Sequence, residues 1–260
     1  MLQEAGASTP ALKVQGLVVR YGGFQAVSGL DLTVPRGSVH GLIGPNGAGK
    51  TSSFNAICGY VQPSAGHVEI HGQRYTHPGP RRAWKLGIGR TFQRVELFWT
   101  LTVAEHLRLA SRLAKRHGRR PPEPQKLLTL FGIDDVADTV VAFLPLGTCR
   151  LVEFARAIAT GADVILLDEP CSGLDRAETA RLQASLEQLR LELGLTLLIV
   201  EHDLEFILDV ADHLTVLDGG SPIESGTPSD IRSSAVVRAA YLGGSVASSS
   251  EIGAEGAGVS

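Results

Sequence analysis

At residues 44–51 the sequence reads Gly44-Pro45-Asn46-Gly47-Ala48-Gly49-Lys50-Thr51, which matches the pattern G-x-x-x-x-G-K-[ST] in full. The stretch follows the short apolar run Ser38–Ile43, and helical periodicity then begins at Lys50 and ends near Gly59. A glycine-rich loop between a strand and a helix lets backbone N–H groups surround phosphate oxygens. The stretch therefore predicts a phosphate-binding loop in an α/β fold.

Two side chains of this loop suit phosphate chemistry. Lys50 supplies a positive charge for phosphate oxygens, and the hydroxyl of Thr51 can coordinate Mg²⁺. The alternative is an ordinary glycine turn before a helix, which the complete pattern and its context disfavour. We therefore expect the whole of residues 44–51 to bind the phosphates of a nucleotide.

A pair of carboxylates, Asp168 and Glu169, follows the apolar strand predicted at Val164–Leu167. Ligands of parallel α/β sheets bind outside the carboxyl ends of the strands. We expect Asp168 to hold Mg²⁺ and Glu169 to polarise a water molecule for attack on a γ-phosphate. A strand that ends in a solvated acidic turn is the alternative, and the phosphate-binding loop upstream argues against it.

The remaining pattern alternates strands and helices. Further strands are predicted at Val14–Arg20, Gly29–Val34, Gly66–Ile70 and Leu195–Val200. Helices are predicted at Val103–Ala114, Gln125–Phe131 and Glu178–Leu193, with a proline-containing loop over Lys115–Pro124. This order favours a mostly parallel sheet covered by helices.

Composition excludes several classes of protein. The 260 residues have a net charge of −3, so nucleic acid is not an expected partner. No apolar run reaches the roughly 20 residues that span a bilayer, and the first ten residues lack the features of a secretory signal. The three cysteines, Cys58, Cys149 and Cys171, fit neither a disulfide framework nor a zinc site. We interpret them as small packing residues in a reduced compartment.

Four further motifs accompany the loop and the acidic pair. They are Arg20-Tyr21-Gly22-Gly23, Arg90-Thr91-Phe92-Gln93, Ser172-Gly173-Leu174-Asp175 and Ile199-Val200-Glu201-His202-Asp203. Taken in this order, the six motifs resemble the ATP-binding cassette ATPases of ABC transporters over residues 12–242. The resemblance implies a P-loop NTPase fold with a mostly parallel core, an antiparallel β part and a helical subdomain at about 97–160. It also implies ATP and Mg²⁺ as cofactors.

The resemblance assigns a role to each motif. Tyr21 would stack on adenine, and Gln93 would lie near Mg²⁺ and the attacking water. His202 would contact the γ-phosphate and orient the water with Glu169, while Asp175 would lie at a dimer contact. The ordinary alternatives are a strand-end tyrosine, a surface glutamine and a structural histidine.

Two segments indicate which branch of this family the chain resembles. Residues 90–98 and 236–243 are similar to importer ATPases for branched-chain amino acids and related polar solutes. This implies a short C-terminal extension at 231–243, and we expect disordered tails at 1–11 and 244–260. The implied partners are a second ATPase subunit, transmembrane permease subunits and, indirectly, a solute-binding protein. The implied location is peripheral, at the cytoplasmic face of the cell membrane.

One motif departs from the family. The usual signature is Leu-Ser-Gly-Gly-Gln, and this chain has Leu144-Pro145-Leu146-Gly147-Thr148. Pro145 lacks the serine hydroxyl and a backbone N–H, and only Gly147 keeps an amide at the matching place. In this family the signature of one subunit closes on the nucleotide of the other. We therefore predict a heteromeric pair in which the partner's nucleotide site is the weaker one.

Some alternatives stay open from the sequence. A non-transport ABC ATPase is disfavoured by the single cassette and the lack of a long heptad run. An ATP-dependent switch with weak hydrolysis is favoured by Pro145 and disfavoured by Glu169 and His202. The basic segment at 115–120 is either a solvated loop or a contact for anionic lipid. Phe98 and Trp99 are either core residues or part of a groove for a permease helix.

Overall fold

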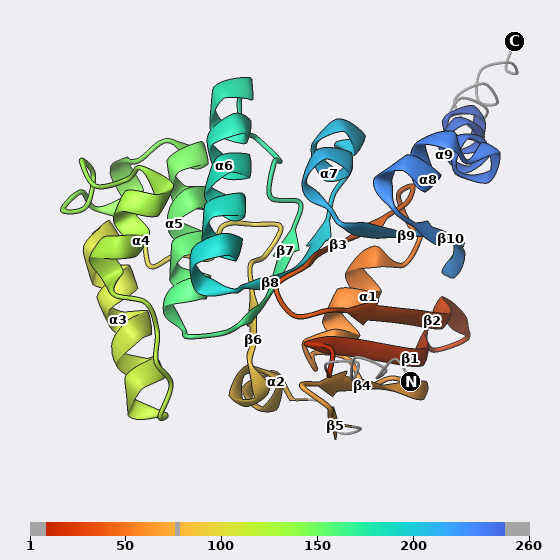
Figure 1. Cartoon of the computed structure of the whole chain (residues 1–260), viewed down its shortest axis with the longest axis horizontal. Helices are drawn as coiled ribbons and strands as arrows, with labels where there is room; N and C mark the ends of the chain where they lie inside the picture. Colours follow the sequence, from red (N-terminus) through yellow and green to blue (C-terminus); the bar gives the residue numbers. More distant parts are fainter. Residues whose placement is uncertain (1–8, 76–78, 248–260) are drawn as a thin grey trace, which may run out of the picture.

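The structure, a computed structural model, describes residues 9–75 and 79–247 and contains two sheets (Figure 1). The larger sheet has the strand order β10 (Ser221–Gly226), β9 (His213–Asp218), β3 (Val39–Ile43), β8 (Thr196–Val200), β7 (Val164–Asp168) and β6 (Ile88–Arg90). The smaller sheet has the order β2 (Phe24–Val34), β1 (Leu12–Tyr21), β4 (Ala65–Ile70) and β5 (Gln73–Tyr75).

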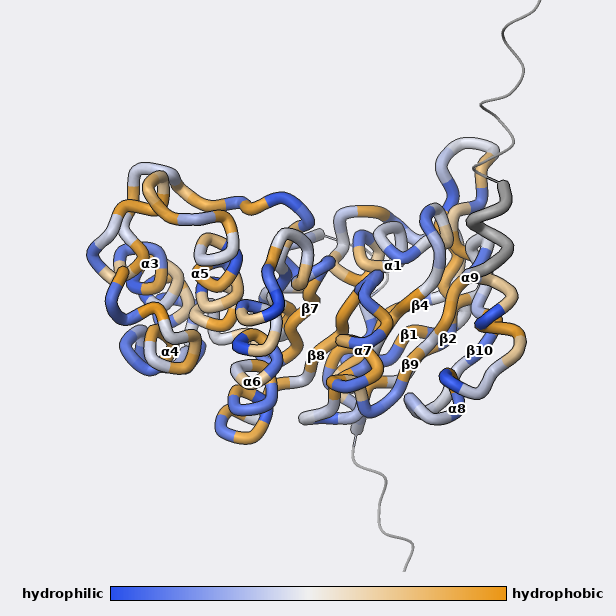
Figure 2. The backbone as a smooth tube through the Cα atoms, turned by 90° about the horizontal axis from the view of Figure 1, so that it is seen from above, coloured by the Kyte–Doolittle hydropathy of each residue, from blue (hydrophilic) through white to orange (hydrophobic). Residues whose placement is uncertain are grey.

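The larger sheet is parallel except at its β10 edge, and the smaller sheet is antiparallel. Every residue of β3, β7 and β8 is buried, which explains their continuous apolar sequences. Figure 2 shows β7 and β8 as mainly hydrophobic segments near the centre of the molecule, next to helices of mixed hydropathy. The predicted fold class is confirmed.

Helices occupy the space around both sheets. They are α1 (Lys50–Ile57), α2 (Pro80–Leu86), α3 (Val103–Arg116), α4 (Pro124–Phe131), α5 (Leu146–Ala159), α6 (Arg176–Leu193), α7 (Leu204–Val210), α8 (Pro228–Ser233) and α9 (Ala235–Ala247), with a 3₁₀ turn at Val141–Phe143. Helix α1 packs between the two sheets, because Phe54 and Ile57 share a buried cluster with Leu17, Leu42 and Leu198. This packing fixes the orientation of the loop that precedes α1.

Helices α3, α4 and α5 form a cluster at the end of the molecule away from the smaller sheet (Figure 1). Thr102 and Glu105 make a capping box at the start of α3. The predicted loop at Lys115–Pro124 is shorter than expected, because α3 continues to Arg116 and Pro124 is already in α4. Proline is tolerated in the first turn of a helix, where its missing N–H has no intrahelical partner.

The expectation of disordered tails at 1–11 and 244–260 is wrong for residues 9–11 and 244–247, which are the parts of the tails that the structure describes. Ala11 is fully buried, and its backbone bonds to Val34 and His71 extend the smaller sheet. At the other end, α9 reaches Ala247. Residues 1–8 and 248–260 lie outside the described residues. Within the described part of the chain, no helix combines the length and the apolar character that a bilayer span needs.

Candidate nucleotide-binding and catalytic site

The phosphate-binding loop joins the end of β3 to the start of α1, as the sequence predicted. Two of its glycines are required by the close approach of other backbone segments. A Cβ atom on Gly44 would lie 2.1 Å from the carbonyl oxygen of Leu217, and one on Gly49 would lie 2.4 Å from that of Ala26. Both glycines also have positive φ values. Only glycine fits the loop at these two positions.

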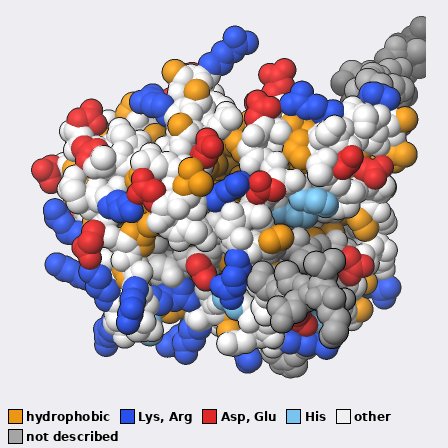
Figure 3. Space-filling view, in the orientation of Figure 1, with side chains coloured by type: hydrophobic (Ala, Val, Ile, Leu, Met, Phe, Trp, Pro, Cys, Tyr) orange, Lys and Arg blue, Asp and Glu red, His pale blue; other side chains and the backbone are white. Residues whose placement is uncertain are grey.

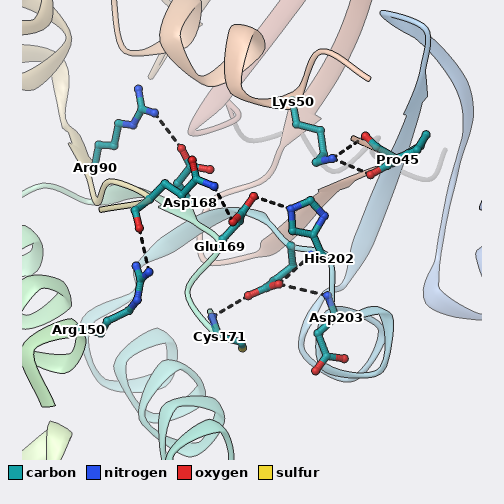
Figure 4. Close-up of polar contacts among 12 residues, drawn as sticks. Pro45, Lys50, Arg90, Arg150, Asp168, Glu169, Cys171, His202 and Asp203 are labelled. Atoms are coloured by element: carbon teal, nitrogen blue, oxygen red, sulfur yellow. Dashed lines mark hydrogen bonds and ion pairs between the residues drawn. The ribbon is translucent and has the colours of Figure 1, made fainter. Parts of the chain in front are cut away.

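Lys50 lies inside the loop with 6% of its surface exposed. Its Nζ donates hydrogen bonds to the carbonyl oxygens of Gly44 (2.6 Å) and Pro45 (2.9 Å), as Figure 4 shows. Burial lowers the pKa of Lys50, and the nearby carboxylates of Glu169 and Asp168 raise it in opposition. The ammonium is therefore held at the loop by two carbonyl oxygens. A bound phosphate can replace these oxygens as acceptors or add a further contact.

Three predicted site residues meet around one carboxylate. Glu169 Oε2 accepts a hydrogen bond from Gln93 Nε2 (3.0 Å), and Glu169 Oε1 lies 2.5 Å from His202 Nε2. The three residues follow β6, β7 and β8, whose carboxyl ends share one edge of the sheet. Glu169 has a φ of 50°, a left-handed conformation that is unusual for a non-glycine residue and is often found at functional sites.

A cavity of about 360 Å³ adjoins this cluster. It is lined by Asn46 to Ser52 of the loop and α1, by Gln93, Glu169 and His202, and by Phe24 and Ala26 of β2. Phe24 is a lining residue that sequence reasoning missed. It lies directly opposite Tyr21 across the turn of the β1–β2 hairpin. The sequence signal that could have identified Phe24 is an aromatic residue three positions after Tyr21. The role of Tyr21 at adenine stays a prediction.

Asp168 ends β7 and is 2% exposed. Its Oδ2 accepts a hydrogen bond from Arg90 Nη2 (2.9 Å), and its backbone N–H donates to Thr91 Oγ1 (3.3 Å). Burial raises the pKa of Asp168, and the Arg90 guanidinium lowers it in opposition. The ion pair therefore favours the carboxylate form in a buried place.

The donor set fits Mg²⁺ in its chemistry. Asp168, Thr51 and Gln93 offer oxygen ligands, and Mg²⁺ usually takes one or two carboxylates together with waters and substrate phosphates. A site made from protein side chains alone is not needed for this ion. Residues 9–75 and 79–247 contain no group of three or more His, Cys, Asp or Glu side chains that could hold a metal ion.

Glu201 is a buried residue that sequence reasoning did not assign to the site. The residue is 3% exposed, and its carboxylate accepts backbone N–H bonds from Cys171 (2.7 Å), His202 (2.7 Å) and Asp203 (3.2 Å). These bonds join the segment after Glu169 to the segment that carries His202. Glu201 therefore fixes the relative placement of the two catalytic candidates.

The altered signature begins helix α5. Pro145 is the N-cap residue, provides no side-chain cap and is exposed, while Gly147 is buried. The preceding Phe143 is 81% exposed. Further along α5, Arg150 donates to the backbone oxygens of Gln93 (2.8 Å) and Ser172 (2.9 Å). The helix that starts with the signature is thus hydrogen-bonded directly to the loops that carry Gln93 and Ser172.

Asp175 caps helix α6. Its side chain accepts a hydrogen bond from the backbone of Glu178, and the Glu178 carboxylate accepts one from the Asp175 backbone. This capping box explains why α6 begins at Arg176, two residues before the predicted start. The predicted role of Asp175 at a dimer contact stays a prediction.

The cysteines behave as packing residues. Cys58 and Cys149 are buried, and burial raises the pKa of Cys58 to about 12. Burial also raises the pKa of Cys149 and of Cys171. Because the thiolate is the reactive form, these environments disfavour thiol chemistry.

Comparisons with known proteins agree with this geometry. A model of the family described as "ABC transporter" matches residues 27–172. The high-affinity branched-chain amino acid transport ATP-binding protein BraF of Pseudomonas aeruginosa is 37% identical over 253 residues, which are 91% of this chain and 99% of BraF. The sulfate/thiosulfate import ATP-binding protein CysA of Methylococcus capsulatus is 34% identical over 85% of this chain and 64% of CysA. The crystal structure of MJ1267 in its ADP conformation, an ATP-binding cassette of an ABC transporter, has a TM-score of 0.79 and 29% identity, covering 90% of this chain and 99% of that one.

Proposed function

This chain belongs to the ABC transporter family and is an ATP hydrolase of the transporter type, and from that premise we propose that it powers an importer of branched-chain amino acids or related small solutes. The similarity to BraF over nearly the whole of both chains supports this class of solute. CysA, which is named for sulfate and thiosulfate import, is matched over 64% of its length, against 99% for BraF. We therefore give the BraF match more weight in the choice of solute class.

One observation supports hydrolysis above the others. Gln93, Glu169 and His202 converge beside the cavity that the phosphate-binding loop lines. In our proposal the loop and Lys50 bind the phosphates of ATP, and Glu169 accepts a proton from the attacking water. His202 orients Glu169 and contacts the γ-phosphate. Asp168, Thr51 and Gln93 would hold Mg²⁺, which neutralises charge on the phosphates when it is bound.

A second surface suits docking of a permease subunit. A cavity of about 150 Å³ is lined by Trp84, Phe98, His106, Leu109, Leu113 and Arg156. Phe98 is 58% exposed and Trp99 is also exposed, so the interpretation of these two residues as core is wrong. His106 accepts a hydrogen bond from the Phe98 backbone at Nε2 and lies 2.8 Å from the Thr102 carbonyl at Nδ1. These contacts fix the rim of the groove.

Exposed basic residues surround the same groove. Figure 3 shows Lys and Arg side chains at the lower left of the visible face, over α2 and the C-terminal end of α3. The exposed basic residues of these two helices are Arg81, Arg82, Lys85, Arg108, Arg112, Lys115 and Arg116. An apolar groove with a basic border fits a short amphipathic helix with acidic side chains. We propose that a permease subunit supplies this helix and keeps the chain on the cytoplasmic face of the membrane.

Co-expression with a permease subunit tests this proposal. We expect the chain to copurify with the permease, and Leu113→Asp to reduce the recovered complex by about tenfold or more, because it buries a charge in the groove. Leu191→Asp is the matched control, since Leu191 is exposed on α6 outside the groove. In reconstituted vesicles, uptake of labelled leucine supports the solute class. Uptake of sulfate without leucine contradicts the solute class, and equal effects of the two substitutions on the recovered complex contradict the docking groove.

The altered signature predicts that the isolated chain hydrolyses ATP slowly. The missing hydroxyl at Pro145 costs about 1–3 kcal/mol of transition-state stabilisation in a closed site. We therefore expect Pro145→Ser to raise the turnover of the isolated chain, and Pro145→Ala, which adds no hydroxyl, to leave it low. Addition of a second cassette subunit with an intact signature should also raise turnover of the wild type.

Steady-state ATPase assays with and without the second subunit decide this question. If the wild-type chain alone already turns over at the rate of the pair and Pro145→Ser has no effect, the proline is tolerated. The Gly147 amide and the N-terminal dipole of α5 are then sufficient. That result also removes the argument for a heteromeric pair.

A further inference from the structure

Arg90 is a buried cation at the end of β6, outside the residues that the catalytic proposal uses. Its Nη1 donates to Asn55 Oδ1 (2.6 Å) and its Nη2 to Asp168 Oδ2 (2.9 Å). The side chains of Arg90 and Asp168 are 8% and 3% exposed. A buried ion pair of this kind depends on both partners, because removal of one leaves an uncompensated charge.

Three aromatic rings surround the Arg90 guanidinium. Its central carbon lies 5.0 Å from the ring centre of Phe92, 5.6 Å from Tyr60 and 5.9 Å from Phe54. These distances are within the range of cation–π attraction. Arg90 Nε also donates to the Thr91 carbonyl oxygen (3.2 Å), so the planar group is held by rings and by three hydrogen-bond acceptors, which leave it little freedom to rotate.

We propose that Arg90 is a positioning residue for the Mg²⁺ ligand Asp168. The proposal rests on the nucleotide site described above and adds a residue that acts through Asp168. Arg90 binds Oδ2, fixes the orientation of the carboxylate and compensates its charge. The carboxylate's other oxygen then points in a constant direction and can coordinate the ion. Partners that orient a metal ligand commonly change metal affinity by 10- to 100-fold when they are removed.

Two of the rings beside Arg90 also line a cavity that shares residues with the docking groove. Tyr60, Phe92 and Arg90 line a cavity of about 170 Å³ together with Trp84, Arg156 and Thr160. The last three residues also line the groove on α3.

Metal binding rather than turnover tests this proposal. Mn²⁺ can replace Mg²⁺ as a probe, and its binding to the full chain with a non-hydrolysable ATP analogue is measured by electron paramagnetic resonance. Arg90→Met keeps a long apolar side chain between the rings and removes the charge. We expect it to weaken Mn²⁺ binding by about tenfold or more, and to leave affinity for the analogue in EDTA within about twofold. Arg90→Lys should restore part of the Mn²⁺ affinity.

Tyr60→Leu provides a milder variant, because Tyr60 is about half exposed and Arg90 keeps its charge and its three hydrogen-bond acceptors. We expect a threefold to fivefold weakening of Mn²⁺ binding, on the scale of one cation–π contact. Tighter Mn²⁺ binding in Arg90→Met overturns the proposal, since Arg90 would then compete with the ion for Asp168. Equal losses with Mn²⁺ and in EDTA also overturn it. Failure of the wild type to bind the analogue contradicts the proposed function instead.

Discussion

Glu169→Gln is expected to lower ATP turnover by roughly 10²-fold or more while ATP affinity stays within about twofold. The substitution keeps the size of the side chain and removes its ability to accept a proton. Gln93 and His202 lie 3.0 and 2.5 Å from the two carboxylate oxygens, so both can still hydrogen-bond an amide in one of its orientations. The loss should therefore appear in kcat and not in binding.

Phosphate release and titration calorimetry separate the two quantities. Glu187→Gln is the matched control, because Glu187 is an exposed glutamate on α6 outside the site, and its turnover should equal that of the wild type. Measurements are made with whichever assembly gives the highest wild-type rate. A Glu169→Gln variant with wild-type turnover would show that another group activates the water.

Lys50→Ala is expected to weaken ATP binding by about 2–3 kcal/mol, or roughly 10²-fold. The wild-type ammonium is almost fully buried and lies among the phosphate-binding loop, Asp168 and Glu169. Removal of this charge leaves two carboxylates near the place where the phosphates bind, and their repulsion adds to the lost contact. The fold should persist, because Lys50 itself lines the cavity, so the truncated side chain leaves space that water can fill.

Calorimetric titration with ATP, and separately with adenosine, tests the assignment. Lys85→Ala serves as the control, since Lys85 is exposed on α2. We expect a large loss for ATP and no change for adenosine in Lys50→Ala, and no change for either ligand in the control. Unchanged ATP affinity in Lys50→Ala would be incompatible with a phosphate contact by this residue.

Contiguous motifs explain why much of the fold was predictable. The apolar run before Gly44 and the periodic segment after Lys50 identify a strand and a helix by local pattern alone. The predicted strand at Val164–Leu167 agrees with β7 to within one residue. The predicted ends of elements were less accurate where a capping residue sets the boundary, as at the start of α6 at Arg176. One hydrogen-bonded side chain can move such a boundary by two residues.

The phosphate-binding loop and the acidic pair could be identified without a structure, because their chemistry lies in neighbouring residues whose geometry follows from one strand end. The distant groups that reach them could be identified only from the folded chain. Arg90 meets Asp168 across 78 positions of sequence and Cys171 meets Glu201 across 30, and Phe24 joins the cavity from the smaller sheet. Parallel pairing of β6, β7 and β8 and the packing of α1 between the sheets create these contacts. They depend on long-range burial, which no local pattern of residues encodes.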